Sequence, residues 1–359
     1  MTAAKIVMLR LLNQQIESSK FRYAKELVGF MGALQAQDYS MAKWAVGLRL
    51  QKSSDKKIEK AVHDGDIIRI HTMRPTWHFV SADDVRWMIE LSAPQVKAIA
   101  KSRHKQLGLT EKIFSKSNSI IEKSLHGGNH LNREELVAKI EKAKIKTDTE
   151  IATHLILAAE MEGIICSGNI KNNKQTYALL DERVPKKKSI TREKALELLA
   201  KKYFSSHSPA TLKDFIWRSG LSVKDGTVAL EMICKDFISE KIGNEIYWFH
   251  NSFDDSLLKK SSVHLLPAFD EFIISYKNRS ASLHADYHKK SISNNGIFSP
   301  MIVVNGEVAG SWKRVFKEDK VIIETDFFKQ HNKKMVAEIK KAAEEFGKFL
   351  KKETEIIIK

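Results

Sequence analysis

The sequence predicts a mainly helical α+β protein, with three tandem winged-helix units followed by a C-terminal β-barrel. Three observations lead to this fold class. A pattern of helical periodicity followed by two short β-type runs occurs three times, and β-type runs dominate after residue 260. The chain has 359 residues and 43% hydrophobic content, which fits two or three domains with a real core.

The first unit is expected to occupy residues 1–83. Two β-type runs, at 67–71 and 77–80, follow its helical part, and helices followed by a β-hairpin describe a winged helix. The helical periodicity predicts helices near 4–16, 23–34 and 40–64. A helical linker with Pro94 inside it is expected over 84–130.

The second and third units are expected at 131–185 and 186–260. The second begins with a capping box at Asn132, a pattern that starts a helix. In the third unit, Ser208 is expected to cap a helix that has Pro209 at its first position. The alternative is three α+β units stacked for stability or protein contacts, because winged helices also serve as interaction modules.

The C-terminal unit is expected to occupy 261–359 as a small β-barrel with one helix. Asn305 and Gly306 form a strong hairpin signal between two β-type runs. The helix is expected near 328–351. Strands are expected at 263–266, 272–275, 301–304, 308–312, 321–325 and 355–358.

The charge balance favours a polyanion partner. There are 60 Lys and Arg against 44 Asp and Glu, giving a net charge of +16 and a pI near 9.5. Such a basic chain fits nucleic acid, although a Lys-rich proteome gives the same excess. Two cysteines exclude a disulfide framework and a Cys-based zinc site. No membrane span or signal-peptide core is evident, so we expect a cytoplasmic protein with no membrane partner.

Two amides and a carboxylate, Gln35, Gln37 and Asp38, are embedded in apolar sequence. Buried polar side chains need hydrogen-bond partners, so this stretch could line the floor of a pocket. A glutamine has one acceptor and two donors and can hold a water or a base edge without carrying charge. The alternative is a pair of satisfied amides in a cleft wall.

Two basic segments are candidate DNA contacts. The first hairpin carries His71, Arg74, Trp77 and His78 around a turn stiffened by Pro75, and such a tip can contact phosphates or stack on a base. It could equally be an ordinary wing with Trp77 in a core. A later basic stretch begins with Lys277 and Arg279 and could follow a phosphate backbone, or be a solvated loop.

We expect structural roles, and not catalytic or metal-binding ones, for two further pairs of residues. Asp270 and Glu271 could do acid–base work, but we expect them to fix the barrel onto the helical units by salt bridges. His126 and His130 are separated by two glycines that break the helix needed to align them, so we expect a polar turn and no metal.

Seven short motifs follow one another along the chain. They are GALQAQD (32–38), WAVGLR (44–49), RPTWH (74–78), SHSPAT (206–211), DFIW (214–217), LLPAFDE (265–271) and GSWK (310–313). In this order they resemble the AlkZ-like winged-helix DNA glycosylases, over about residues 8–325. The resemblance implies three winged helices in a C-shaped arrangement with a β-barrel, and cleavage of the N-glycosidic bond of N7-alkylguanine. Some members of the family unhook interstrand crosslinks, and a sister group has Gln-x-Asp where this chain has Gln35 and Gln37.

The chemistry that this resemblance implies is physically reasonable. N7-alkylation gives guanine a positive charge and makes it a good leaving group, so positioning of water can supply much of the catalysis. We assign Gln35 and Gln37 to that water, with Asp38 as a supporting or direct electrostatic group. Family members also insert a hairpin into the minor groove, and both the Arg74 tip and the 277–290 stretch qualify. Members of the family commonly have His-Gly-Pro where this chain has His-Ser-Pro, with Ser208 in place of the glycine, so we expect the local turn to differ in shape.

We therefore expect a monofunctional glycosylase that needs no cofactor and acts on alkylated or crosslinked double-stranded DNA. A monomer is expected because no zipper or long apolar dimer helix is evident. The alternative is a non-enzymatic winged-helix DNA-binding protein, either a regulator or an architectural protein. It would bind duplex DNA in a salt-dependent way without releasing a base. A third hypothesis is a protein-interaction scaffold that has no affinity for DNA.

Overall fold

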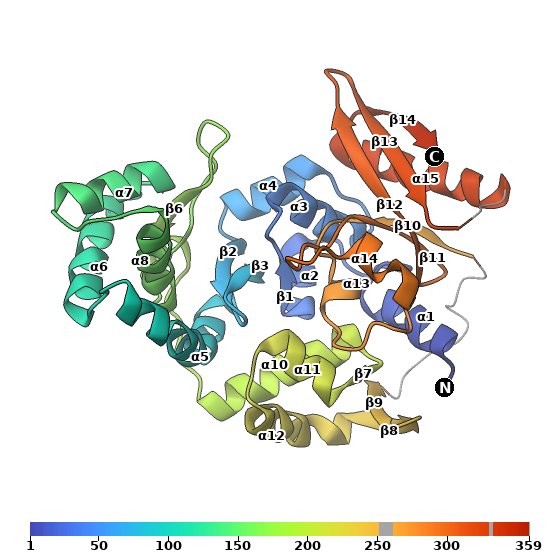
Figure 1. Ribbon diagram of the computed structural model, residues 1–359, viewed down its shortest axis with the longest axis horizontal. Coiled ribbons are helices and arrows are strands. Elements are labelled where there is room, and N and C mark those ends of the chain that lie inside the picture. Colours follow the sequence, from blue (N-terminus) through green and yellow to red (C-terminus); the bar gives the residue numbers. More distant parts are fainter. Residues whose placement is uncertain (251–260, 330–332, 359) are drawn as a thin grey trace.

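The computed structural model describes residues 1–250, 261–329 and 333–358 (Figure 1). The N-terminal part has four helices, and the last three of them pack on a three-stranded antiparallel sheet with the order β1-β3-β2. The expected helix at 40–64 is two helices, because Ser54 caps a new helix by accepting from the Lys57 amide. The elements are α1 (Ala3–Asn13), α2 (Ala24–Met31), β1 (Ala33–Gln35), α3 (Tyr39–Leu48), α4 (Asp55–His63), β2 (Ile67–Thr72) and β3 (Thr76–Ser81).

A second helical group with its own core follows and lies at the left of Figure 1. Its short sheet has the order β4-β6-β5. The capping box predicted at Asn132 is confirmed, since Asn132 and Glu135 bind each other's backbone N–H groups. The elements are α5 (Val85–Gln106), α6 (Glu111–Leu125), β4 (Leu131–Asn132), α7 (Arg133–Lys142), α8 (Thr149–Met161), β5 (Ile165–Ser167), β6 (Thr176–Leu179) and α9 (Leu180–Arg183).

A third group repeats the arrangement with the sheet order β7-β9-β8. The helix start expected at Ser208 and Pro209 is wrong. Ser208 ends α10, and the next helix is capped by Thr211, whose side chain forms a capping box with Asp214. The elements are α10 (Arg192–His207), β7 (Ala210–Thr211), α11 (Leu212–Ser219), α12 (Val223–Ile233), η1 (Cys234–Asp236), β8 (Phe237–Ile242) and β9 (Glu245–His250).

The C-terminal part is a curled five-stranded sheet with the order β10-β11-β12-β13-β14. Its described strands do not pair β10 with β14, so the sheet is open where a barrel was expected. The strand expected at 272–275 is instead a helical turn, because Asp270 caps it by accepting from the Phe272 amide. The elements are β10 (Val263–Leu266), α13 (Glu271–Ile274), η3 (Ala285–Tyr287), α14 (His288–Ser291), β11 (Met301–Val304), β12 (Glu307–Phe316), β13 (Lys320–Phe327), α15 (Lys333–Leu350) and β14 (Glu353–Ile358).

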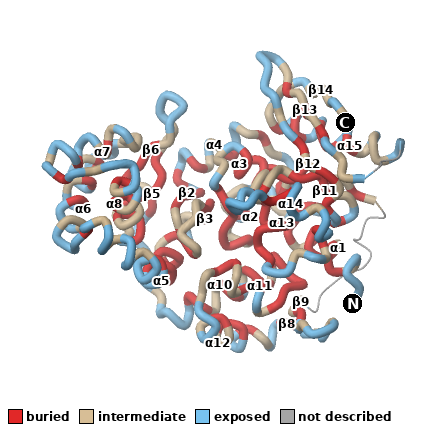
Figure 2. The backbone as a smooth tube through the Cα atoms, viewed as in Figure 1, coloured by how far each residue is buried: buried red, intermediate tan, exposed pale blue. Residues whose placement is uncertain are grey.

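One apolar core joins this C-terminal sheet to the N-terminal helices, and Figure 2 shows the buried backbone concentrated there, around α2, α3 and β12. Trp44 of α3 packs against Phe346 and Phe349 of α15, and its indole N–H donates to the Leu265 carbonyl at 2.8 Å. Burial of such rings contributes most of the packing energy, and the polar N–H fixes their orientation. Within the described ranges, no helix is long and apolar enough to cross a membrane.

Candidate active site

The two glutamines lie on and beside β1, the edge strand of the N-terminal sheet. Gln35 is buried and stands opposite His78 of β3, whereas Gln37 is exposed just beyond the strand. The Gln35 amide nitrogen donates to the Gln37 amide oxygen at 2.8 Å, and the Thr76 hydroxyl is 3.4 Å from the Gln35 amide oxygen. The amide nitrogen of Gln37 has no partner among the described residues. The joined pair therefore presents a hydrogen-bond donor at the surface, backed by a buried amide.

Arg69 of β2 fixes the backbone that carries this pair. Its Nε donates to the Ala36 carbonyl at 2.9 Å, and its guanidinium lies 4.0 Å from the centroid of the Trp77 ring. The Ala36 amide in turn donates to the Trp77 carbonyl at 2.7 Å. The segment between the two glutamines is therefore held from the hairpin side.

Buried charges hold the other side of β1. Glu271 accepts from the Gln35 amide at 2.6 Å, and Arg218 of α11 donates to the Ala33 carbonyl at 2.8 Å. The two side chains bind each other at 2.8 Å. The salt-bridge role expected for Asp270 and Glu271 is confirmed, since Asp270 pairs with Arg49 at 2.7 Å.

The titratable groups behind Gln35 have strongly shifted pKa values. Burial, aided by the Arg218 charge, lowers the pKa of His78 well below its ordinary value. His78 Nδ1 lies 2.8 Å from the Thr76 carbonyl and Nε2 lies 3.3 Å from Arg218, so a neutral ring donates to the first and accepts from the second. Arg218 and the neighbouring His207 hold the pKa of Glu271 far below its usual range, against the opposing effect of burial.

Asp38 is held in structural contacts. It caps α3 by accepting from the Met41 amide at 3.0 Å and also accepts from the Ser40 hydroxyl. Arg314 of β12 lies 3.7 Å from its carboxylate. Asp38 therefore fixes the chain just after Gln37 and ties it to the C-terminal sheet.

The structure separates the four hairpin residues predicted to contact DNA. His78 is fully buried and hydrogen-bonded on both ring nitrogens, so the expected DNA contact by His78 is wrong. His71 bonds to buried Glu160 of α8 and packs on Trp77, with ring centroids 3.8 Å apart. These two half-buried rings join the first sheet to the second helical group. Arg74, at the turn, lies instead beside Trp217 of α11.

Arg74 meets the other predicted basic segment around the indole of Trp217. The ring centroid lies 4.8 Å from the Arg74 guanidinium, 4.6 Å from the Lys277 ammonium and 5.4 Å from the Arg279 guanidinium. None of these three cations has an ion-pair partner in the part of the chain that the structure describes. We call Arg74, Lys277, Arg279 and Trp217 the cation cluster.

Local structure explains why the cation cluster forms. α11 ends at Gly220 in the left-handed region, φ +71°, and a Cβ there would lie 3.0 Å from the Arg74 side chain, so the hairpin turn packs directly on the helix end. Asp214 accepts from the Lys277 amide at 2.8 Å, which holds the basic segment beside the same helix. Burial, with the charges of Arg218 and Arg279, lowers the pKa of Arg74 to about 10.

Trp217 and Arg218 were not predicted as site residues, although both lie in or next to the motif at 214–217 that carries the resemblance. Their positions on one short helix do not indicate that Trp217 contacts three cations or that Arg218 binds β1. Both roles depend on α11 meeting the hairpin and α13 in space.

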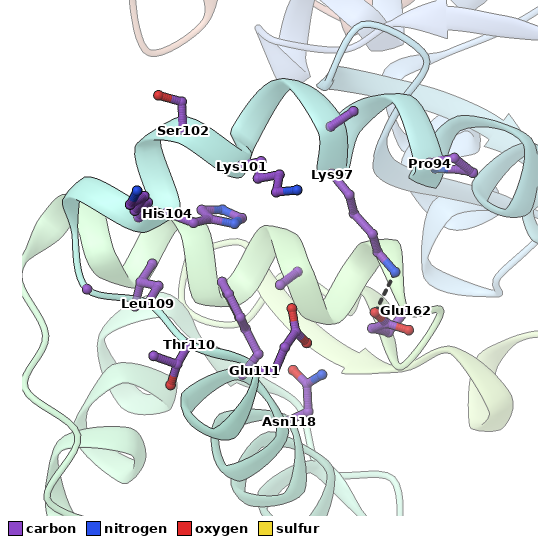
Figure 3. A pocket seen from close by; sticks show the side chains of 15 residues that line it. Pro94, Lys97, Lys101, Ser102, His104, Leu109, Thr110, Glu111, Asn118 and Glu162 are labelled. Carbon is purple, nitrogen blue, oxygen red and sulfur yellow. Dashed lines mark hydrogen bonds and ion pairs between the residues drawn. The ribbon is translucent and has the colours of Figure 1, made fainter.

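A large cavity lies elsewhere, between α5, α6 and α8. Its volume is about 1070 Å³, and Figure 3 shows Lys97 and Glu162 joined across it at 2.6 Å. Lys101, His104 and Phe114 also line it. No residue predicted for the site is among its lining residues, so the size of this cavity does not locate the glutamine pair.

Comparison with known proteins gives concordant matches. A family model described as DNA glycosylase AlkZ-like matches residues 28–349. The chain is 23% identical, over 86% of its length and 87% of the relative's, to a Streptomyces sahachiroi protein named interstrand DNA cross-link repair glycosylase. The solved structure of Streptomyces sahachiroi DNA glycosylase AlkZ superposes over the whole of both chains with a TM-score of 0.82 at 19% identity.

Proposed function

Because the chain belongs to the AlkZ-like DNA glycosylase family, we propose that it hydrolyses the N-glycosidic bond of N7-alkylguanine in duplex DNA. It acts as a monofunctional glycosylase, with water as the nucleophile. The observation that carries this proposal is the joined pair of amides, with Gln37 exposed and Gln35 anchored from both sides of its strand.

The proposed roles follow from the chemistry of neutral amides. The Gln37 amide group holds the attacking water near the anomeric carbon, and Gln35 fixes the orientation of Gln37 through their 2.8 Å hydrogen bond. An amide cannot take up the proton of water strongly, so the reaction depends on a leaving group that already carries positive charge. An N7-alkylguanine meets that requirement. Asp38 supports the pair by fixing the chain after Gln37.

The cation cluster supports a path for the DNA backbone beside the glutamines. Arg74 is two residues from Thr76, whose hydroxyl lies near the Gln35 amide. Three cations around one indole, with no ion-pair partner in the described part of the chain, favour a phosphate group as their ligand. We propose that Arg74, Lys277 and Arg279 bind DNA phosphates, so both basic segments contribute to one surface. His71 and Trp77 instead hold the hairpin against the second helical group.

The finer architecture belongs to the same proposal. Three sheets have one strand order, in which the third strand along the chain lies in the middle, and this supports three winged helices within 1–83, 131–185 and 186–260. The proposed domains also include the linker at 84–130 and the C-terminal unit at 261–359.

We further propose that the protein acts as a monomer in the cytoplasm and that it unhooks interstrand crosslinks. The name of the Streptomyces sahachiroi relative supports the last of them.

The test is release of the modified base. Wild-type protein is incubated with duplex DNA containing N7-methylguanine or a nitrogen-mustard crosslink, and alkali then cleaves each abasic site for detection on a gel. We expect strand cleavage by the wild type and none by Gln37→Ala. Salt-dependent DNA binding with no base release would support the non-enzymatic alternative and end the catalytic assignment.

A further inference from the structure

We propose that the buried ion pair of Arg218 and Glu271 positions the catalytic strand by occupying its open edge, as a further β-strand would. This inference rests on the proposed function of Gln35 and Gln37, and it assigns no contact with DNA to the ion pair. Arg218 and Glu271 are positioning residues, since they act on the reaction only through β1.

The backbone geometry of β1 carries the inference. In an extended strand, successive N–H and C=O groups point to opposite sides. The Ala36 amide bonds to β3, so the polar groups of Ala33 and Gln35 point away from the sheet. These outward groups are the Ala33 carbonyl and the Gln35 amide, and they bind Arg218 and Glu271 at 2.8 and 2.6 Å. A donor and an acceptor from side chains thus replace those of a missing strand.

The ion pair is itself held rigidly. Glu271 and Arg218 are 1% and 4% exposed. The Ser275 hydroxyl donates to the Glu271 carboxylate and lies 3.1 Å from Arg218 Nε. The remaining guanidinium nitrogen, Nη1, contacts the His78 ring and the sulfur of Met73. Because each partner has several fixed contacts, the pair can set the position of the Gln35 backbone and not merely follow it.

The chain contains a matched control next to the pair. Asp270 precedes Glu271 and forms a two-pronged ion pair with Arg49, at 2.7 and 2.9 Å. Both members of that pair are as buried as Arg218 and Glu271. Neither binds β1. Asn can keep the helix cap that Asp270 provides, so Asp270→Asn removes a buried charge and one of the two hydrogen bonds to Arg49.

The experiment compares Glu271→Gln with Asp270→Asn in the full chain. We measure the single-turnover rate of N7-methylguanine release, the dissociation constant for the same duplex and the midpoint of urea unfolding. Both variants are expected to unfold at lower urea. Only Glu271→Gln is expected to lose rate, by about tenfold to hundredfold per folded molecule, because small misplacement of a reacting group has effects of this order. Its dissociation constant should stay within about twofold of the wild type.

Equal rates per folded molecule for the two variants would overturn the inference, because the pair would then serve stability alone. If Glu271→Gln does not fold, Arg218→Lys decides, since lysine keeps the charge but cannot reach Glu271 and the Ala33 carbonyl together. Loss of rate in Arg218→Lys supports the inference, and a rate like that of the wild type overturns it.

Hydrogen exchange separates this inference from the proposed function. Exchange of the Gln35 amide should accelerate in Glu271→Gln and not in Asp270→Asn, whether or not the wild type releases a base. If the wild type releases no base but the exchange pattern is as expected, the proposed function is refuted. The role of the ion pair in holding the open edge of β1 is then still supported. Base release by the wild type with unchanged Gln35 exchange in Glu271→Gln would refute the inference alone.

Discussion

The glutamine pair on β1 and the cavity between α5, α6 and α8 are opposites in their physical character. The cavity is large, about 1070 Å³, and one of its three lysines, Lys97, is paired with Glu162. The void beside Ala33 of β1 has a volume of only about 10 Å³, but the buried polar groups around this strand are tightly bound. Its cation cluster has no ion-pair partner among the described residues. Buried polar groups cost folding free energy unless they are hydrogen-bonded, and strongly shifted pKa values such as those of His78 and Glu271 cluster at functional sites. The difference teaches that anchored amides backed by buried charges mark a candidate site better than volume does.

The largest effect is expected from the amides themselves. Gln35→Ala/Gln37→Ala, like Gln37→Ala alone, should reduce base release below detection, a loss of at least about a hundredfold in rate, because the attacking water loses its orientation. Phe114→Leu in the cavity should leave the rate within about twofold. Single-turnover assays on N7-methylguanine DNA measure both. If the two changes had similar effects, the contrast between the regions would be lost.

A smaller effect is expected from the cation cluster. Arg74→Gln/Arg279→Gln should weaken binding to any duplex sequence and reduce the slope of log affinity against log salt by about two, one for each cation removed. The matched control is Lys101→Gln in the cavity, which should change this slope much less. Fluorescence anisotropy at several salt concentrations gives both slopes. Equal slopes for the two variants would remove the phosphate assignment.

The region behind Gln35 should also make stability depend on pH. Burial lowers the pKa values of His78 and His207 below the ordinary 6.5, so the unfolded chain binds more protons than the folded chain below that pH. Their contribution is complete above pH 6.5 and is lost as the pH falls toward their folded values, at up to about 1.4 kcal/mol per pH unit for each imidazole.

Urea unfolding at pH 7.5, 6.0 and 5.0 checks this expectation. Glu271 does not interfere, because a carboxylate whose pKa is lowered in the folded state loses its contribution only below its unfolded value, 4.5. His78→Asn should flatten the pH dependence by about one proton. A free energy of unfolding that does not change over this range would show that the buried imidazoles are not held neutral.

The smallest effect is expected in the cavity. Ala158→Leu adds apolar surface to a half-buried lining position that is open to solvent. The free energy of unfolding should change by less than about 0.5 kcal/mol, and base release should not change. Thermal unfolding and the gel assay measure these values. A large loss of base release would place the cavity in the reaction after all.

Local sequence signals predicted much of the secondary structure and little of the site geometry. The Asn132 capping box and the hairpins at 67–80 and 301–312 depend on neighbouring residues, and they lie where expected. The Ser208 helix start and the 272–275 strand were wrong, because Thr211 and Asp270 provided side-chain caps that decided the local structure. His78 was read as a surface residue because strand alternation does not say which face of a hairpin is covered.

The sequence by itself determined the basic charge, the helix and hairpin pattern, and the paired amides at Gln35 and Gln37, because each is a property of composition or of residues close along the chain. Only the tertiary structure decided what surrounds that pair. Arg218 and Glu271 reach β1 from positions 185 and 236 residues away in the chain. Such contacts depend on how α11 and α13 pack against an edge strand, and packing between distant elements leaves no local pattern in the sequence.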